Sequence, residues 1–254
     1  MASLWSCLNH FKGSDNLKLE RFLQKAGIAS RRKASGLIEA GTVTVNGEVC
    51  QAFWKQVDPE VDRVEYKGER VLLEKKVYYK LNKPQGYICA LEDPFGTPTI
   101  VDYLTRVHAI DKRVHPVGRL DKDTEGLLLL TNDGDFTYRI LHPKMKIEKE
   151  YLAKVKGRPD ESVVEQFKQG IQLRNFKTAP AVLKIEDQTG QNTWVRIIIK
   201  EGKKRQVKRM CSFLGHKVLY LKRLRVDSFT LDGVENVGDL QKIPKEEIDS
   251  FMKE

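Results

Sequence analysis

The sequence has few of the residues that build disulfide scaffolds, metal centres or membrane spans. It contains 4 cysteines and 5 histidines among 254 residues, and neither type recurs at the spacing of a disulfide framework or a zinc site. No apolar run approaches the roughly 18 to 20 residues that cross a bilayer. The first residues also lack the cationic and apolar regions of a signal peptide. We therefore expect a protein without a metal or a membrane anchor, in the reducing cytoplasm.

Positive charge, in contrast, is in excess. The chain carries 45 Lys+Arg against 35 Asp+Glu, a formal net charge of +10, and its sequence pI is about 9.3. Such an excess favours a polyanionic partner, either nucleic acid or an acidic membrane surface. The length is sufficient for one large domain and one small domain.

The most informative segment places Asp121 between cations, just before a fully apolar run. The loop Arg119-Leu120-Asp121-Lys122 leads into four leucines, Leu127–Leu130, whose pattern predicts a strand buried on both faces. A carboxylate on such a rigid element, flanked by cations, should stay ionised, which suits a nucleophile or a general base. An Arg-Leu-Asp triplet alone would also fit a simple surface turn.

The Asp121 loop is one of several segments of this chain that resemble motifs of a single family. The run Val117–Asp135 resembles the signature loop of the pseudouridine synthases, specifically the ribosomal-RNA branch typified by RsuA and RluB. Three further segments resemble other motifs of that family: Lys80–Gly86, Glu148–Tyr151 and Glu201–Met210. Several long motifs in the right order are far more specific than one alone. The resemblance covers roughly residues 17 to 248.

The resemblance implies site-specific isomerisation of uridine to pseudouridine in ribosomal RNA, without a cofactor. It makes Asp121 the essential catalytic residue and Tyr151 the aromatic residue that stacks on an extruded uracil. It also implies that Lys208 pairs with Asp121 and that Arg119 contacts the RNA or the pocket. A tyrosine half-buried on a sheet and an ordinary surface lysine are the simpler interpretations of Tyr151 and Lys208.

The chain is expected to form an α+β protein with two folded units. Residues 1–16 form a leader outside the resemblance, and residues 17–66 form an RNA-binding domain. Residues 67–76 are a charged linker, partly ordered as a strand, and residues 77–254 form the catalytic domain. In the catalytic domain, the pattern predicts a mixed sheet with helices on one side.

The first unit is predicted to contain two short helices packed on a hairpin. Leu19, Phe22 and Leu23 recur at helical spacing, Ser30 is the expected cap of the second helix, and Asn46-Gly47 is a strong hairpin turn. This pattern resembles the small αL RNA-binding module first named from a ribosomal protein. Three cations in the first turn of the second helix oppose the helix dipole and favour an RNA phosphate site: Arg31, Arg32 and Lys33.

The expected elements of the second unit alternate irregularly. Strands are predicted near residues 77–81, 127–131, 151–156, 181–185, 193–200 and 218–221, and helices after Asp135, Asp160, Arg205 and Pro244. The segment from Lys200 to Arg225 is strongly basic and predicts a groove that follows an RNA backbone, with Arg205 and Arg209 among its contacts.

Two other functions remain open from the residues alone. One is a non-catalytic, ribosome-associated RNA binder in which Asp121 is structural. The other is a glycosidase with two carboxylates, Asp121 with Glu125 or Asp133, although the basic surface argues against a neutral sugar. The partner is expected to be ribosomal RNA or an assembling subunit, with a weak preference for the large subunit, and nothing requires more than a monomer.

Overall fold

The computed structural model describes residues 16–110 and 113–253, which form two compact units. The first unit ends at Lys75 and the second begins at Lys76. Residues 1–15, nearly all of the expected leader, lie outside the described residues. Among the described residues, no helix is long and apolar enough to cross a membrane.

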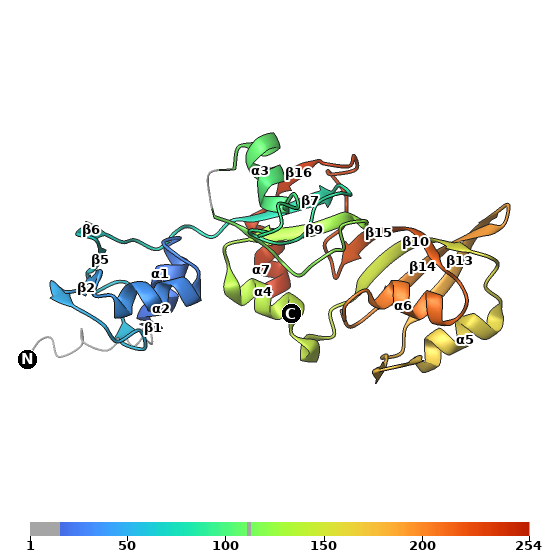
Figure 1. Ribbon diagram of the computed structural model, residues 1–254, viewed down its shortest axis with the longest axis horizontal. Coiled ribbons are helices and arrows are strands. Elements are labelled where there is room, and N and C mark those ends of the chain that lie inside the picture. Colours follow the sequence, from blue (N-terminus) through green and yellow to red (C-terminus); the bar gives the residue numbers. More distant parts are fainter. Residues whose placement is uncertain (1–15, 111–112, 254) are drawn as a thin grey trace, which may run out of the picture. The chain divides into compact units, whose positions relative to one another are not determined.

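In the first unit, two helices accompany a small sheet (Figure 1). Ser30 caps the second helix by accepting a hydrogen bond from the Lys33 amide. The helices are α1 (Leu19–Lys25) and α2 (Arg31–Glu39). The sheet has the order β3-β2-β5-β6, from β2 (Val43–Val45), β3 (Glu48–Val49), β5 (Val64–Tyr66) and β6 (Glu69–Arg70), and a separate pair joins β1 (Leu17–Lys18) to β4 (Gln56–Val57).

The predicted helices and hairpin are confirmed, but the sheet is larger than the sequence indicated. The strands β5 and β6 extend the hairpin. A strand was expected within residues 67–76, where β6 lies, but β5 was missed because its three residues show no clear alternation. The strand β6 lies within the segment expected to be the linker. Val71 beyond it is buried in the core of this unit, so the chain remains part of the first unit at these positions.

The second unit is built on a mixed sheet of eight strands, as predicted. Its order is β13-β14-β10-β15-β9-β7-β16, with β8 also paired to β9, and the pair β9–β15 is parallel. The strands are β7 (Tyr78–Lys83), β8 (His115–Pro116), β9 (Glu125–Thr131), β10 (Lys149–Lys156), β13 (Val182–Thr189), β14 (Asn192–Ile199), β15 (Val218–Val226) and β16 (Leu240–Lys242). A short pair, β11 (Gln172–Leu173) and β12 (Phe176–Lys177), stands apart.

Helices cover both faces of this sheet, so the prediction of helices on one side was wrong. The leucines of β9 show why: Leu128 and Leu130 belong to one core, whereas Leu127 and Leu129 belong to another. Two opposite faces that are both apolar must both be covered. The helices α3 (Ile100–His108), α5 (Glu161–Gln169) and α6 (Gln206–Phe213) bury residues in the first core, and α4 (Gly134–Leu141) and α7 (Lys245–Lys253) do so in the second.

Most helix starts agree with the sequence, and one helix was missed. Asp160 caps α5, and α6 and α7 follow Arg205 and Pro244 as predicted. The unexpected helix is α3, where Thr99 and Asp102 form a reciprocal capping box. That motif is readable in the sequence and was overlooked.

Candidate active site

The loop that carries Asp121 connects β8 to β9 and is fixed from beneath by a buried lysine. Lys83, at the end of β7, is fully buried. Its ammonium donates hydrogen bonds to the carbonyl oxygens of Pro84 at 2.9 Å, Asp121 at 3.3 Å and Thr124 at 3.1 Å. Burial lowers the pKa of Lys83, and the neighbouring acidic groups partly oppose that shift. The backbone of the loop is therefore held on a rigid strand.

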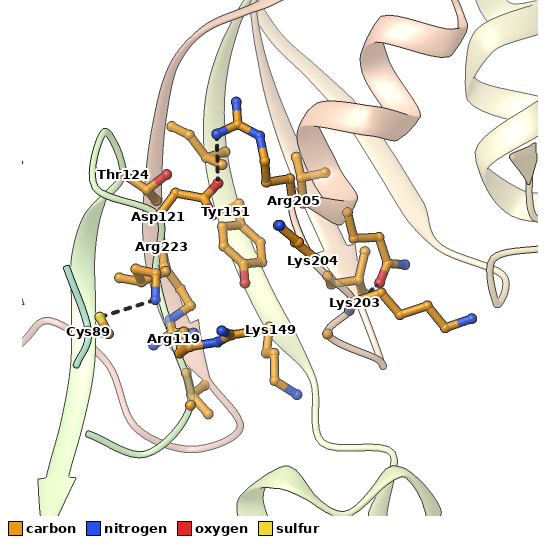
Figure 2. Close-up of a pocket in the computed structure, with 18 of the residues that line it drawn as sticks. Cys89, Arg119, Asp121, Thr124, Lys149, Tyr151, Lys203, Lys204, Arg205 and Arg223 are labelled. Atoms are coloured by element: carbon orange, nitrogen blue, oxygen red, sulfur yellow. Dashed lines mark hydrogen bonds and ion pairs between the residues drawn. The ribbon is translucent and has the colours of Figure 1, made fainter. Parts of the chain in front are cut away.

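The Asp121 carboxylate meets two cations from the N-terminal end of α6. Lys208 Nζ lies 3.3 Å from Asp121 Oδ2, and Arg205 Nη1 lies 4.0 Å from the same oxygen (Figure 2). Lys208 also donates to Asp123 Oδ1 at 2.5 Å and to Thr124 Oγ1 at 3.1 Å. The expected pairing of Lys208 with Asp121 is thus shared with Asp123, which the sequence had not suggested.

The short contact to Lys208 also affects Asp123 itself. Burial alone would raise the pKa of Asp123, but the hydrogen bond and charge of Lys208 bring it below its ordinary value. The Asp121 side chain remains 29% exposed at the cavity. A carboxylate that is fixed by its backbone, neighboured by cations and still accessible is able to act on a bound substrate.

Beside Asp121 lies a cavity of about 1150 Å³. Tyr151, on β10, forms part of its wall and is only 8% exposed. Figure 2 shows its ring between Asp121 at one end and Lys149 at the other. Apolar side chains such as Val207 and Leu221 also line the cavity. An aromatic face in an apolar, enclosed space suits a flat ring such as a nucleobase.

Two cations of this wall were not predicted as site residues. Lys149 begins β10, and Arg223 lies on β15 directly opposite Tyr151 in the strand register. Both are buried. Burial, followed by repulsion from Arg223, lowers the pKa of Lys149 to about 8. The sequence showed the positive charge of this region, but a pairing between segments so far apart along the chain carries no local signal.

Glycine at position 126 allows this arrangement. Gly126 pairs with Arg223 across the parallel strands β9 and β15 and has φ +103°. A Cβ atom at this position would lie 2.1 Å from the Arg223 carbonyl oxygen. Only glycine therefore permits the close approach of the strand that carries Arg223.

The other predicted RNA contacts divide between the cavity and other surfaces. Arg119 and Arg205 both line the cavity. Arg209 lies outside its lining, and its guanidinium sits 5.0 Å from the centre of the Phe176 ring. A cation over an aromatic face is attracted electrostatically by the ring. Arg205 therefore lies at the site, whereas Arg209, four residues later, lies outside it.

In the first unit, Arg31 at the start of α2 forms an ion pair with Glu20. Arg31 donates two hydrogen bonds to the buried Glu20 carboxylate, at 2.9 and 2.7 Å. Arg32 and Lys33 follow it on the exposed first turn of α2. Arg31 thus has a structural partner within its own unit, although its side chain remains 66% exposed.

The two carboxylates considered for a glycosidase are occupied elsewhere. Glu125 accepts a hydrogen bond from the Tyr220 hydroxyl at 2.7 Å. Asp133 caps α4 and also binds Tyr78 and Lys76. Neither residue lines the cavity with Asp121, so the two-carboxylate arrangement is wrong. No cluster of three or more potential metal ligands occurs among residues 16–110 and 113–253.

Comparison with known proteins identifies the family to which the chain belongs. The profile of the RNA pseudouridylate synthase family matches residues 77–213, and that of the S4 domain matches residues 17–52. The ribosomal large subunit pseudouridine synthase B of Bacillus subtilis is 41% identical over 91% of this chain and 93% of its own length. The chain belongs to the RsuA/RluB type of RNA pseudouridine synthases. It is thus an enzyme, an isomerase, with an N-terminal S4 domain.

Other relatives support the same assignment. The ribosomal small subunit pseudouridine synthase A of Escherichia coli is 37% identical to this synthase, over 93% of the chain and all of the relative. A crystal structure of a pseudouridylate synthase has 34% sequence identity and a TM-score of 0.65, and covers 92% of this chain and 98% of its own. The chain therefore matches these relatives over nearly all of their length.

Proposed function

We propose that this synthase isomerises a specific uridine of ribosomal RNA, with Asp121 acting on an extruded nucleotide. The bond between the base nitrogen and the ribose breaks, the base turns, and a bond forms between the ribose and C5, which releases the C5 hydrogen. The observation that carries the proposal is the accessible Asp121 carboxylate, fixed through its backbone by Lys83 and paired with Lys208 beside an enclosed cavity.

Tyr151 and Lys208 have separate roles in this proposal. The Tyr151 ring stacks on the extruded uracil, because its face borders the cavity next to Asp121. Lys208 orients the Asp121 carboxylate, and the contact of Lys208 with Asp123 holds the lysine side chain in place. The rearrangement consumes no energy source and no redox partner, and so needs no cofactor.

The substrate strand is bound by cations near the cavity and on the S4 domain. Arg119 and Arg205 line the cavity, and Arg31, Arg32 and Lys33 offer a second basic surface at the start of α2. Arg209 contributes charge beyond the cavity while it stacks on Phe176. Binding of this kind weakens steeply with added salt.

We infer ribosomal RNA, or an assembling ribosomal subunit, as the partner because two named relatives act on the ribosomal subunits. The relative named for the large subunit is 41% identical, and the one named for the small subunit is 37% identical. These identities do not distinguish the two subunits, and we propose the large subunit because residues 117–135 and 201–210 resemble RluB-like sequences. We further propose a monomer that works in the cytoplasm, where ribosomes are assembled.

The test is tritium release from ribosomal RNA transcripts that carry tritium at C5 of uridine. We expect release with the native protein and none with Asp121→Asn, whose affinity for RNA should stay within severalfold of native. Substantial turnover by Asp121→Asn would refute the role of Asp121. Tight binding by the native protein without release from either subunit's RNA would instead favour a non-catalytic binder.

A further inference from the structure

The cavity has a cationic end that the chemistry assigned to Asp121 does not use. Lys149, Arg223 and Arg119 all line the cavity. Figure 2 shows Lys149 and Arg119 toward the hydroxyl end of the Tyr151 ring, whereas Asp121 lies toward the other end. The charge of Arg223 acts on Lys149, and the charges of Arg223 and Arg119 both act on the thiol of Cys89, so the three cations share one region.

Two of these cations are almost fully buried and have few partners. Arg223 is 4% exposed; its Nε donates to the Leu127 carbonyl oxygen at 2.7 Å, while its Nη2 has no hydrogen-bond partner among the described residues. Lys149 is 9% exposed, and its Nζ donates to the Ile147 carbonyl oxygen at 3.0 Å. Buried ionised groups are costly unless they are fully paired.

The nearby carboxylates are engaged with other cations. Glu148 and Glu150 flank Lys149 in the sequence, yet both accept hydrogen bonds from Arg225, at 3.0 and 2.8 Å. Glu150 also pairs with Arg196. Within residues 16–110 and 113–253, no carboxylate lies at ion-pair distance from Lys149, Arg223 or Arg119. Asp227 acts on Lys149 only from beyond ion-pair distance. The positive charge at this end of the cavity is therefore only partly compensated within the described residues.

We propose that Arg119, Lys149 and Arg223 bind a phosphodiester group of the RNA strand, adjacent to the uridine on which Asp121 acts. This subsite rests on the proposed function. A phosphodiester carries one full negative charge, and guanidinium and ammonium groups both bind phosphate well.

The spacing of the strand supports a phosphate beside a stacked base. Lys149 and Tyr151 are two residues apart on one face of β10, so their Cα atoms are separated by about 7 Å, on the scale of one extruded nucleotide. The detached uracil is a weaker candidate because it becomes anionic only after the C–N bond breaks, whereas the cations are present in the resting site.

The test compares the binding of uridine 5′-monophosphate and uridine to the full-length protein, by calorimetry at fixed ionic strength. We expect the native protein to bind the monophosphate at least about tenfold more tightly, because a charge-assisted contact to phosphate is strong. Lys149→Met should remove most of that preference without changing the affinity for uridine, and Lys149→Arg should retain it.

A matched control lies on the same strand. Lys154 is on the opposite face of β10, over the Trp194 ring, so Lys154→Met removes the same charge and should leave the preference intact. Melting curves with added inorganic phosphate give a second readout. Phosphate should raise the Tm of the native protein more than that of Lys149→Met.

The outcomes separate this subsite from the proposed reaction. Equal affinity of the native protein for uridine and its monophosphate would overturn the phosphate subsite, even if tritium release proves the isomerisation. If Lys149→Met then slowed release, the cations would act on the departing base instead. A phosphate preference that depends on Lys149 would uphold the subsite even if tritium release failed.

Discussion

Two buried lysines beside the cavity, Lys83 and Lys149, differ in how the protein compensates their charge. Lys83 donates to three backbone carbonyl oxygens of its own strand end and the Asp121 loop. Lys149 has one such acceptor and lies near the like charge of Arg223. Both side chains are removed from water, so the number of acceptors separates a structural lysine from one that has a single acceptor and can still bind an anion.

The same contrast recurs at the two ends of the cavity. At the Asp121 end, Lys208 is matched by Asp121 and Asp123, so the charges balance within the protein. At the other end, Arg223 and Lys149 have no carboxylate at ion-pair distance among the described residues, and only Asp227 opposes the charge of Lys149 from farther away. A balanced end suits chemistry on a neutral base and sugar, and an unbalanced end suits an anionic part of the substrate.

The largest expected effect comes from comparing Lys83→Met with Lys149→Met. Loss of Lys83 leaves one buried and two partly buried carbonyl oxygens without their donor, so we expect the free energy of unfolding to fall by about 3 kcal/mol. Lys149→Met removes a poorly paired buried charge and should leave the free energy of unfolding unchanged or slightly higher. Urea unfolding of both variants measures these free energies. Equal stability of the two variants would contradict the distinction between a structural Lys83 and a poorly paired Lys149.

The next effect concerns Tyr151, which lies between the two ends of the cavity. If its ring stacks on uracil, Tyr151→Ala should slow single-turnover isomerisation by about 10- to 100-fold, because stacking on a base contributes about 1–3 kcal/mol. Tyr151→Phe keeps the ring and should lose much less. Single-turnover rates of both variants at saturating RNA test whether the ring stacks on uracil. Losses of equal size would show that Tyr151 acts through its hydroxyl group instead.

A smaller effect is expected at Lys208, the matched cation. Lys208→Ala leaves Asp121 with Arg205 at 4.0 Å and should reduce the single-turnover rate by about tenfold, since the carboxylate loses the contact that holds it in position. Lys208→Arg keeps the charge but changes a point contact into a planar fork, so its rate should fall between native and Ala. An unchanged rate for Lys208→Ala would exclude the pairing role.

The smallest effects compare Arg31 with Arg32 in the S4 domain. Arg32→Ala should weaken RNA binding and lower the slope of log affinity against log salt by about 1, without changing the Tm. Arg31→Ala leaves the Glu20 carboxylate without its main partner and should also reduce the free energy of unfolding, by about 1 kcal/mol for such an exposed arginine. Filter binding over a salt series and thermal unfolding measure both effects.

Local signals made much of the fold predictable. Ser30 and Asp160 were identifiable as helix caps, and the four leucines from Leu127 indicated a strand buried on both faces. The same leucines also implied that both faces need cover, which the prediction of helices on one side ignored. The capping box of Thr99 and Asp102 was a second local signal that went unused.

Residues of the site could be predicted from the sequence only where they stand in a family motif or beside one. Asp121, Tyr151 and Lys208 stand in recognisable motifs, and the structure brings them to one cavity. The pairing of Tyr151 with Arg223, which brings Arg223 to the cavity wall beside Lys149, depends on the register between β10 and β15, which no local pattern encodes. The hydrogen bonds from Lys83 to the Asp121 loop likewise arise from tertiary contacts.

The most direct test of this account measures two quantities for three proteins: native, Asp121→Asn and Lys149→Met. They are the single-turnover rate of tritium release at saturating ribosomal RNA transcript and the dissociation constant for that transcript. We predict that Asp121→Asn loses the rate and keeps its affinity within severalfold, whereas Lys149→Met loses affinity and keeps most of the rate. If both variants lost the rate equally with unchanged affinity, the assignment of chemistry to one end of the cavity and strand binding to the other would be contradicted.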